Sequence, residues 1–300
     1  MSSQRPPAGQ APIGTPAPSP ALLTLPAPRH LHEFLARSQH LHFGFFEAAG
    51  DSLAQAQDRL ILRSARFLLR DSNVVDIGCG LGGTAHLLAG LGHRVVGLDP
   101  CASSIAYARA RAVSPRAQFL HGGLAAFVAR ARGARFDALF LTEILSQFTD
   151  LSAAFTQCRA LLRPGGLVLV HEVVRNPAAP VGQEYFHPRG AMRSAADAAG
   201  FDLVEIRDAT NRTAPTLSRL LRALAERRAE LLRFFAPVRP EIVSECEAFE
   251  THLRAVELAF SRQELFFETC VLRSSARFGS DSVTLRARPA VVPVRREPAS

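Results

Sequence analysis

The residues with the clearest chemical meaning form a glycine-rich turn in the stretch VVDIGCGLGG. Gly78, Gly80 and Gly83 fit the spacing G-x-G-x-x-G between an apolar run and a helical pattern, and a glycine at 82 also fits G-x-G-x-G. Such glycines let a ligand approach the backbone. Asp99 ends the next apolar run, where its carboxylate can accept hydrogen bonds from ribose hydroxyls. Tight turns also contain glycine when no ligand binds there. The prediction of a nucleotide-type ligand therefore depends on Asp99 and on the position of the turn between a strand and a helix.

Asp76 lies two residues before Gly78 and bears on which nucleotide the turn favours. A carboxylate there would repel the pyrophosphate of NAD, whereas it would attract a cationic amino group. S-adenosylmethionine carries such a group, together with a ribose for Asp99. The alternatives are that Asp76 caps the turn through backbone N–H groups, or that the chain is an NAD-linked oxidoreductase. We expect S-adenosylmethionine as the cofactor.

The elements that must position these residues alternate between apolar runs and amphipathic patterns. Strands are predicted at 73–78, 93–99, 117–122, 136–142 and 167–174, and helices at 52–70, 83–91, 102–112 and 151–163. Strands separated by helices imply right-handed crossovers and a parallel sheet that is covered on both faces. In such sheets the ligand lies beyond the carboxyl ends of the strands.

The pattern changes after residue 174, where it predicts a helix at 190–200, a strand at 201–208, helices at 214–235 and 239–260, and a strand at 263–273. The helical pair is too long for a crossover loop, so we interpret it as a cover over the substrate. Its alternative role is to complete the outer layer of the sheet. The predicted fold class is α/β, with a Rossmann-like, doubly wound, mostly parallel sheet and a helical cap inserted before the last strand.

Two tails are expected outside this domain. Residues 1–28 contain eight of the twenty prolines and no acidic residue, which predicts a disordered segment. Residues 276–300 are basic and expected to be flexible. The domain would then comprise residues 29–275, with its helical cover at about 211–262.

Composition disfavours several other classes of protein. The chain has 35 Lys and Arg against 27 Asp and Glu, and every one of these cations is an arginine. About half of the excess positive charge lies in residues 273–300, so we expect a solvated tail and no nucleic-acid site. Five scattered cysteines without a C-x-x-C pair predict no disulfide framework and no metal site. Without an apolar run long enough to span a bilayer, or a signal-peptide core at the start, a cytoplasmic protein is expected.

Consecutive motifs of the chain resemble those of class I S-adenosylmethionine-dependent methyltransferases. The matching stretches are VVDIGCGLGG, GLDP at 97–100, FDALFLTEILSQF and RALLRPGGLVLVHEV, and the resemblance covers about residues 40–275. LHFGFFEAAGDSLAQAQDRL and QELFFETCVLRSS are similar to the entry segment and the closing strand of a narrower group. That group acts on small molecules and includes antibiotic-pathway O-methyltransferases and tocopherol and phosphoethanolamine methyltransferases.

The resemblance implies a set of contacts to S-adenosylmethionine. The methionine half would be held by Asp76, Gly78, Cys79, Gly80 and Gly82. The ribose would be bound by Asp99, and the adenine would be flanked by Pro100, Gly122, Gly123 and Leu124. The sulfonium would be bordered by Leu141 and Thr142, and a lid would include His42, Phe43 and Phe45. By spacing alone, Phe43 and Phe45 fit the core equally well.

Two departures from the family pattern bear on the chemistry. Gly123 stands where the family often has an acid that accepts a hydrogen bond from the adenine amino group. Ser146 and Gln147 replace a histidine pair that is the suspected general base in many relatives, and neither can act as a base near pH 7. The catalytic group is therefore unknown. The remaining candidates for a catalytic role are His171, Glu172, His121, Gln147, Glu184 and His187.

Methyl transfer is an in-line displacement, so orientation supplies much of the acceleration, and an acceptor that is already nucleophilic needs no base. The missing histidine pair favours such an acceptor over a simple sugar hydroxyl. The twenty phenylalanines favour a lipophilic acceptor if any of them reach the site, although FGFF at 43–46, FF at 234–235 and FF at 266–267 also fit a plain core. Glu143 is interpreted as structural.

We therefore expect methyl transfer to a small-molecule acceptor, in secondary metabolism. The alternative is a protein of this fold that binds the cofactor but catalyses another reaction or acts as a binding partner. The sequence does not predict the acceptor or the oligomeric state.

Overall fold

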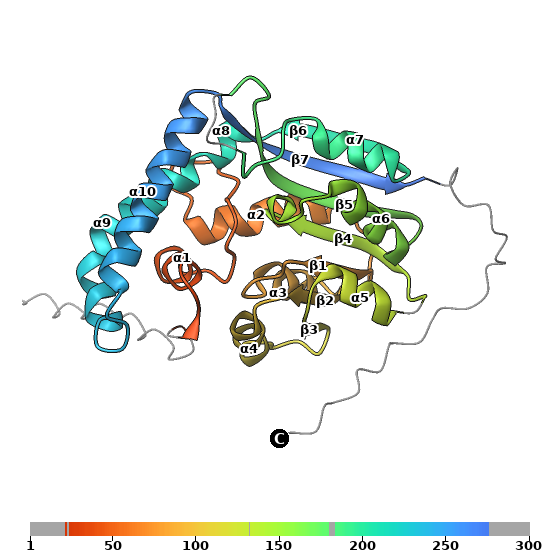
Figure 1. Ribbon diagram of the computed structural model, residues 1–300. Coiled ribbons are helices and arrows are strands. Elements are labelled where there is room, and N and C mark those ends of the chain that lie inside the picture. Colours follow the sequence, from red (N-terminus) through yellow and green to blue (C-terminus); the bar gives the residue numbers. More distant parts are fainter. Residues whose placement is uncertain (1–21, 23, 132, 180–183, 276–300) are drawn as a thin grey trace, which may run out of the picture.

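A seven-stranded sheet in the order β3-β2-β1-β4-β5-β7-β6 forms the centre of the fold (Figure 1). Its strands are β1 (Asn73–Ile77), β2 (Arg94–Asp99), β3 (Ala117–His121), β4 (Phe136–Thr142), β5 (Leu162–Arg175), β6 (Phe201–Asp208) and β7 (Leu265–Ser274). The first five strands pair in parallel, and β7 runs antiparallel to both β5 and β6. The predicted α/β class with a mostly parallel sheet is confirmed. This computed structural model describes residue 22 and residues 24–131, 133–179 and 184–275.

Helices cover both faces and one end of the sheet. In chain order they are α1 (Arg29–Ala36), α2 (Leu53–Ala65), α3 (Gly83–Gly90), α4 (Ala102–Ala110), α5 (Leu124–Ala131), the short 3-10 helix η2 (Leu145–Gln147), α6 (Leu151–Leu161), α7 (Ala191–Ala198), α8 (Thr210–Thr213), α9 (Pro215–Phe235) and α10 (Ile242–Ser261). Ser52 caps α2, where its side chain accepts a hydrogen bond from the Gln55 N–H and the Gln55 side chain accepts one from the Ser52 N–H.

Alternating side chains of the central strands build one apolar layer on each face. Val75 and Leu139 belong to the layer that contains α6 and α7. Val74 and Ala138 belong to the layer that contains α3 and α4. Because both faces are buried, β1 is almost wholly apolar, and Asp76 is the exception within its buried part.

The helical cap is formed by α9 and α10, which lie side by side at one end of the sheet, with α1 packed against α9 (Figure 1). Both helices lie between β6 and β7 in the chain, as predicted. Phe46, Phe235 and Phe267 are buried in one apolar cluster with these helices. The doubled phenylalanines therefore contribute to the core, which is one of the two roles that the sequence left open.

The sequence pattern missed α1 and α5. Helix α5 spans only eight residues, which are too few for a helical period to stand out in the sequence. Helix α1 carries the buried histidines His30 and His32, which a pattern of apolar residues does not count. Ahead of α1, Leu22 and Leu25 are buried in the core. Packing thus reaches into the predicted proline-rich tail. Residues 1–21 and 23 of that tail and residues 276–300 lie outside the described residues.

Candidate functional site

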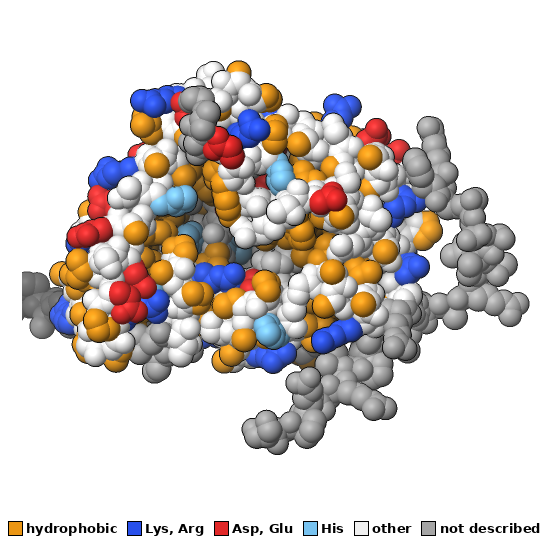
Figure 2. Space-filling view, viewed as in Figure 1, with side chains coloured by type: hydrophobic (Ala, Val, Ile, Leu, Met, Phe, Trp, Pro, Cys, Tyr) orange, Lys and Arg blue, Asp and Glu red, His pale blue; other side chains and the backbone are white. Residues whose placement is uncertain are grey.

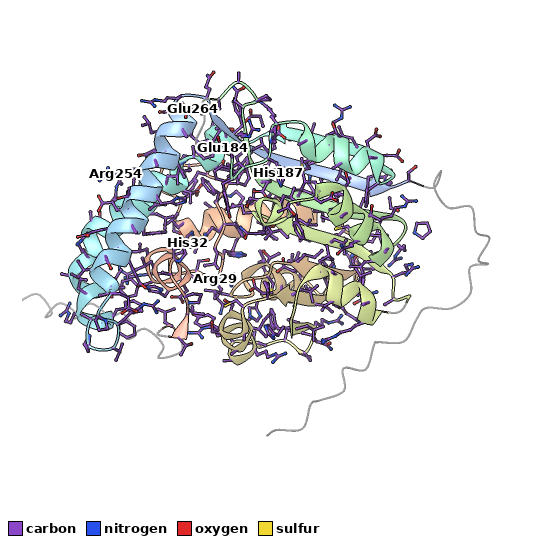
Figure 3. All side chains as sticks on the ribbon, in the orientation of Figure 1. Arg29, His32, Glu184, His187, Arg254 and Glu264 are labelled. Atoms are coloured by element: carbon purple, nitrogen blue, oxygen red, sulfur yellow. The ribbon has the colours of Figure 1, made fainter. Side chains whose placement is uncertain are left out.

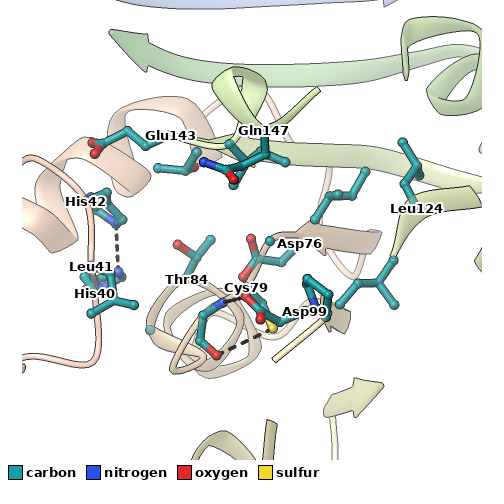
Figure 4. A pocket seen from close by; sticks show the side chains of 18 of the residues that line it. His40, Leu41, His42, Asp76, Cys79, Thr84, Asp99, Leu124, Glu143 and Gln147 are labelled. Atoms are coloured by element: carbon teal, nitrogen blue, oxygen red, sulfur yellow. Dashed lines mark hydrogen bonds between the residues drawn. The ribbon is translucent and has the colours of Figure 1, made fainter. Parts of the chain in front are cut away.

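A cavity of about 490 Å³ lies at the carboxyl ends of β1, β2 and β4. Figure 2 shows this face of the molecule hollowed near its centre, between the helical cap and the sheet, with histidine side chains in and around the hollow. The wall of the cavity is formed by the glycine turn, by the ends of the strands and by the segment between α1 and α2 (Figure 4). This is the position at which a parallel α/β sheet binds its ligand.

The turn after β1 brings its backbone to the wall of the cavity. Gly78 has a φ of 74°, and a Cβ at this position would lie 2.3 Å from Cγ2 of Ile144. Gly82 has a φ of 88°, and a Cβ there would meet the ring of Phe119 at 2.9 Å. The N–H of Gly78 donates to the carbonyl of Leu98 at 2.8 Å, which fastens the turn to β2. Only glycine satisfies both the conformation and the space at these two positions.

Asp99 presents its carboxylate to the cavity from the end of β2. Its Oδ2 accepts a hydrogen bond from the Gly80 N–H at 3.0 Å, and its Oδ1 accepts one from the Cys101 N–H at 2.8 Å. The guanidinium of Arg29 on α1 donates to the same Oδ1 at 3.1 Å, and Figure 3 labels Arg29 and His32 on this helix. A carboxylate offers about four lone-pair positions, so Asp99 can still accept a hydrogen bond from a ligand hydroxyl.

Asp76 points into the cavity from the middle of the sheet, and the residue is only 2% exposed. Its Oδ2 has no hydrogen-bond partner within the described part of the chain. Burial, together with the nearby charge of Asp99, raises the pKa of Asp76 to about 7. A buried carboxyl oxygen beside a cavity indicates that a ligand supplies the missing donor, and a cationic donor would also restore the ionised form.

The end of β3 forms another part of the wall, where Gly122, Gly123 and Leu124 border the cavity. A second cavity of about 600 Å³ lies alongside, between β3 and α5, and shares both glycines with the first. His121 lines this second cavity and not the first, and its Nε2 bonds to the Pro100 carbonyl at 3.0 Å. His121 therefore does not face the cavity where the glycine turn and the two aspartates meet.

His171 and Glu172 of β5 do not line the cavity either. The ring of His171 is fully buried, with Ser64 Oγ at 2.7 Å from Nε2 and Thr142 Oγ1 at 3.0 Å from Nδ1, and burial lowers its pKa to about 3. The carboxylate of Glu172 accepts a hydrogen bond from the Leu145 N–H at 2.6 Å, and burial raises its pKa to about 7. Both side chains are engaged inside the protein, which explains their polarity without a catalytic role.

Gln147 does line the cavity, and its amide donates to the hydroxyl of Tyr185. His187 donates from Nε2 to the carbonyls of Leu145 and Phe148 at 3.0 and 2.9 Å. Figure 3 labels His187, and Glu184 nearby, on the loop that follows β5. The amide of Gln147 can position a ligand, whereas it cannot take up a proton near pH 7.

The three residues expected in the lid point to different sides. His42 lines the cavity, and Phe43 and Phe45 do not. The ring of Phe43 packs against Phe260 and Phe267, with centroid distances of 5.7 and 5.4 Å. The ring of Phe45 borders a separate cavity of about 160 Å³. The cover over the cavity is therefore formed by the side chain of His42 and its neighbours, while the two phenylalanines anchor the segment.

A chain of hydrogen bonds ties this segment to α2. Asp58 Oδ1 lies 2.9 Å from Nε2 of His40, and Nδ1 of His42 lies 2.7 Å from the Phe43 carbonyl. Between them, Nδ1 of His40 lies 2.8 Å from Nε2 of His42 (Figure 4). The carbonyl and the carboxylate only accept, so His42 donates from Nδ1 and His40 donates from Nε2. Burial and the proximity of His40 hold the pKa of His42 well below its usual range, which keeps His42 neutral.

The structure brings together most of the predicted site residues and adds others. The predicted residues that line the cavity are Asp76, Gly78, Cys79, Gly80, Asp99, Pro100, Gly122, Gly123, Leu124, Thr142, Gln147 and His42. Gly82 and Leu141 do not line it, since Gly82 packs on Phe119 and Leu141 is buried in the layer of α6. The sequence missed Arg29, His40, Thr84 and Glu143, which also line the cavity. The repeated histidine spacing at 40 and 42 is the signal that could have indicated His40.

Within the described residues, no three His, Cys, Asp or Glu side chains gather into a group that could hold a metal ion. In the same part of the chain, no helix is both long and apolar enough to cross a membrane.

Residues 75–170 match the family model described as a methyltransferase domain. A curated relative, the ubiquinone biosynthesis O-methyltransferase of Rhodopseudomonas palustris (strain BisA53), is 35% identical over 124 residues, which are 39% of this chain and 49% of the relative. The chain thus spans about half the length of the curated relatives it matches.

Solved structures extend the likeness to most of the chain. The [4+2]-cyclase SpnF superposes with a TM-score of 0.69 at 21% identity, over 85% of this chain and 93% of that one. The mycolic acid cyclopropane synthase CmaA1, solved in complex with SAH and CTAB, gives a TM-score of 0.69 at 18% identity, over 82% of this chain and 95% of that one. At these identities the likeness establishes the fold.

Proposed function

Because the chain contains a class I S-adenosylmethionine-dependent methyltransferase domain, we propose that it transfers the methyl group of S-adenosylmethionine to the hydroxyl oxygen of a small, lipophilic phenol. The observation that carries this proposal is the unpartnered carboxyl oxygen of Asp76 in the cavity beside the glycine turn. This carboxylate would attract the ammonium group of the cofactor's methionine half, whereas it would repel an anionic pyrophosphate.

The rest of the cavity fits the same cofactor. Gly78 and Gly80 leave room along the backbone of the turn, and Asp99 offers a carboxylate to the ribose hydroxyls. Gly123 supplies no side-chain acceptor for the adenine amino group, so we assign adenine recognition to backbone groups and to contact with Leu124. When bound, the cofactor would supply an electrophilic methyl group on a sulfonium.

The acceptor class is supported by two features. The curated relatives are named O-methyltransferases of ubiquinone biosynthesis, which favours an oxygen acceptor. Around the cavity, Leu41, Ile144 and Phe148 add apolar wall, which favours a lipophilic ring over a sugar. These relatives do not belong to secondary metabolism by name, so the expected place in secondary metabolism stays a prediction, as does a cytoplasmic location.

Calorimetry with the purified protein tests the cofactor. We expect S-adenosylmethionine and S-adenosylhomocysteine to bind with one-to-one stoichiometry and NADH not to bind. Binding of NADH alone would contradict the proposal and favour an oxidoreductase.

Incubation with methyl-labelled cofactor and a panel of phenols, followed by mass spectrometry, then tests the reaction. The expected product is a labelled methyl ether. Cofactor binding without transfer to any acceptor, in the panel or in a cell extract, would favour the alternative of a binding protein or of another reaction on this fold.

A further inference from the structure

Glu143 is the residue that follows β4, on the cavity wall between Thr142 and Ile144. Its backbone has a φ of 55°, in the left-handed region that side chains other than glycine rarely adopt. The Glu143 N–H donates to the carbonyl of His171 at 2.8 Å, so β5 holds the residue in this conformation. Strained backbone of this kind is stored preferentially at functional sites, because the surrounding fold must stabilise it.

Among the described residues, hydrogen bonding holds one oxygen of the Glu143 carboxyl group. Its Oε1 accepts a hydrogen bond from the Phe43 N–H at 2.6 Å. Within the described residues, neither an arginine nor a histidine forms an ion pair with this carboxyl. Figure 4 shows the carboxylate on the same side of the cavity as His42. The lid segment therefore orients the group and leaves its second oxygen available to a ligand in the cavity.

The electrostatic surroundings suit proton uptake. Burial, with a smaller contribution from the neighbouring Glu172, raises the pKa of Glu143 well above its usual range. A carboxylate with little stabilisation of its charge is a stronger base than one paired with an arginine. The other titratable groups near this wall are already engaged: His171 with Ser64 and Thr142, and His42 with His40 and a carbonyl.

We propose that Glu143 is the general base of the reaction, an inference that rests on the proposed transfer to a phenol. Its Oε2 accepts the hydroxyl proton as the acceptor oxygen forms its bond to the methyl carbon. The carbon–sulfur bond breaks with its electron pair remaining on sulfur. The products are the methyl ether, the neutral thioether and the protonated carboxyl of Glu143. Glu143 thus takes over the role of the histidine pair that Ser146 and Gln147 replace.

The test compares Glu143→Gln with the natural protein on two phenols of similar shape, one unsubstituted and one carrying a nitro group that ionises it at the assay pH. Glutamine keeps an oxygen for the Phe43 N–H and removes the base. For the unsubstituted phenol, kcat/KM should fall by about 10²–10⁴-fold. For the ionised phenol the loss should stay below about tenfold, since that acceptor has no proton to lose. An equal loss for both phenols, or no loss, would overturn the assignment.

Glu268→Gln is the control, because Glu268 is a buried carboxyl on the neighbouring strand β7 that does not line the cavity and is paired with Arg189. Any effect of this variant should come through stability and should be equal for the two phenols. If the natural protein binds the cofactor but methylates neither phenol, that result contradicts the proposed function and also the role of Glu143 as its base. Selective loss in the control would also overturn the role of Glu143.

A second readout does not depend on turnover. The infrared band of a protonated carboxyl that is present in the natural protein and missing in Glu143→Gln reports the ionisation of Glu143 directly. We expect this band to persist well above pH 4.5, the usual pKa of a glutamate side chain. Titration at that usual value would remove the basis for proton uptake by this group. Calorimetric affinity for S-adenosylhomocysteine should change by less than about threefold in the variant, since the thioether carries no charge toward Glu143.

Discussion

Replacement of Asp76 by asparagine should change both the stability of the ligand-free protein and its affinity for the cofactor. In the ligand-free protein the pKa of Asp76 is raised from 3.8 to about 7, mainly by burial. Between pH 3.8 and about 7, Asp76 is therefore still protonated in the folded protein but ionised in the unfolded chain. The free energy of unfolding should fall as pH rises through this range, by a ceiling of roughly 4 kcal/mol for one such group. Asp76→Asn should abolish this fall and unfold at a higher temperature than the natural protein above pH 7.

The same substitution should weaken cofactor binding. An ammonium bound to the ionised carboxylate makes a charge-assisted hydrogen bond, whose loss costs about 1.5–3 kcal/mol. Asp76→Asn should therefore bind S-adenosylhomocysteine about 10- to 150-fold less tightly at pH 8. Below pH 7 the natural protein must release the Asp76 proton before it binds, so its affinity should fall about tenfold per pH unit. The variant should lose this slope.

The assay is titration calorimetry between pH 6 and 9, together with thermal unfolding of the ligand-free proteins. Asp202→Asn is a suitable control, because Asp202 is an exposed aspartate on β6 that does not line the cavity. Equal affinities of Asp76→Asn and the natural protein at every pH would refute the reasoning. A lower unfolding temperature of Asp76→Asn above pH 7 would refute the electrostatic part of it.

Three further substitutions test other parts of the site. Asp99→Ala should weaken cofactor binding by about 1–3 kcal/mol, because a hydrogen bond to ribose is lost, and an unchanged calorimetric titration would contradict this. Gly78→Ala should destabilise the fold by roughly 2 kcal/mol or more, through its positive φ and the contact with Ile144, so an unchanged unfolding temperature would be inconsistent with the turn described. Asp58→Asn removes the carboxylate that His40 bonds to and should speed hydrogen exchange in residues 40–46, whereas unchanged exchange would show that the chain of hydrogen bonds does not hold the lid segment.

The parts of the site that follow from local sequence were predictable. The glycine turn, Asp76 and Asp99 all lie at or next to the ends of strands that short apolar runs identify, and the topology of a parallel sheet brings these ends together. The succession of β6, the helical cap and β7 along the chain could be predicted from the change in pattern after residue 174. Local pattern and fold agree for β1 and β4 because these strands are buried on both faces.

The remaining features depend on contacts between segments distant in sequence. Arg29 reaches Asp99 across 70 positions, and the Phe43 N–H reaches Glu143 across 100. No local pattern encodes such pairs, so Glu143 was expected to be structural. The polarity of His171 suggested a base, whereas the fold buries it against Ser64 and Thr142. A strand-end histidine cannot be assigned from sequence because its partners come from another element.

The measurement that bears most directly on the central claim is transfer of an isotope-labelled methyl group from S-adenosylmethionine, catalysed by the natural protein and followed by mass spectrometry. We predict that the natural protein forms a labelled methyl ether of a lipophilic phenol. At limiting cofactor, Asp76→Asn should form much less of this product. Absence of labelled product from every phenol and every cell-extract fraction, with the cofactor shown to be bound, would contradict it.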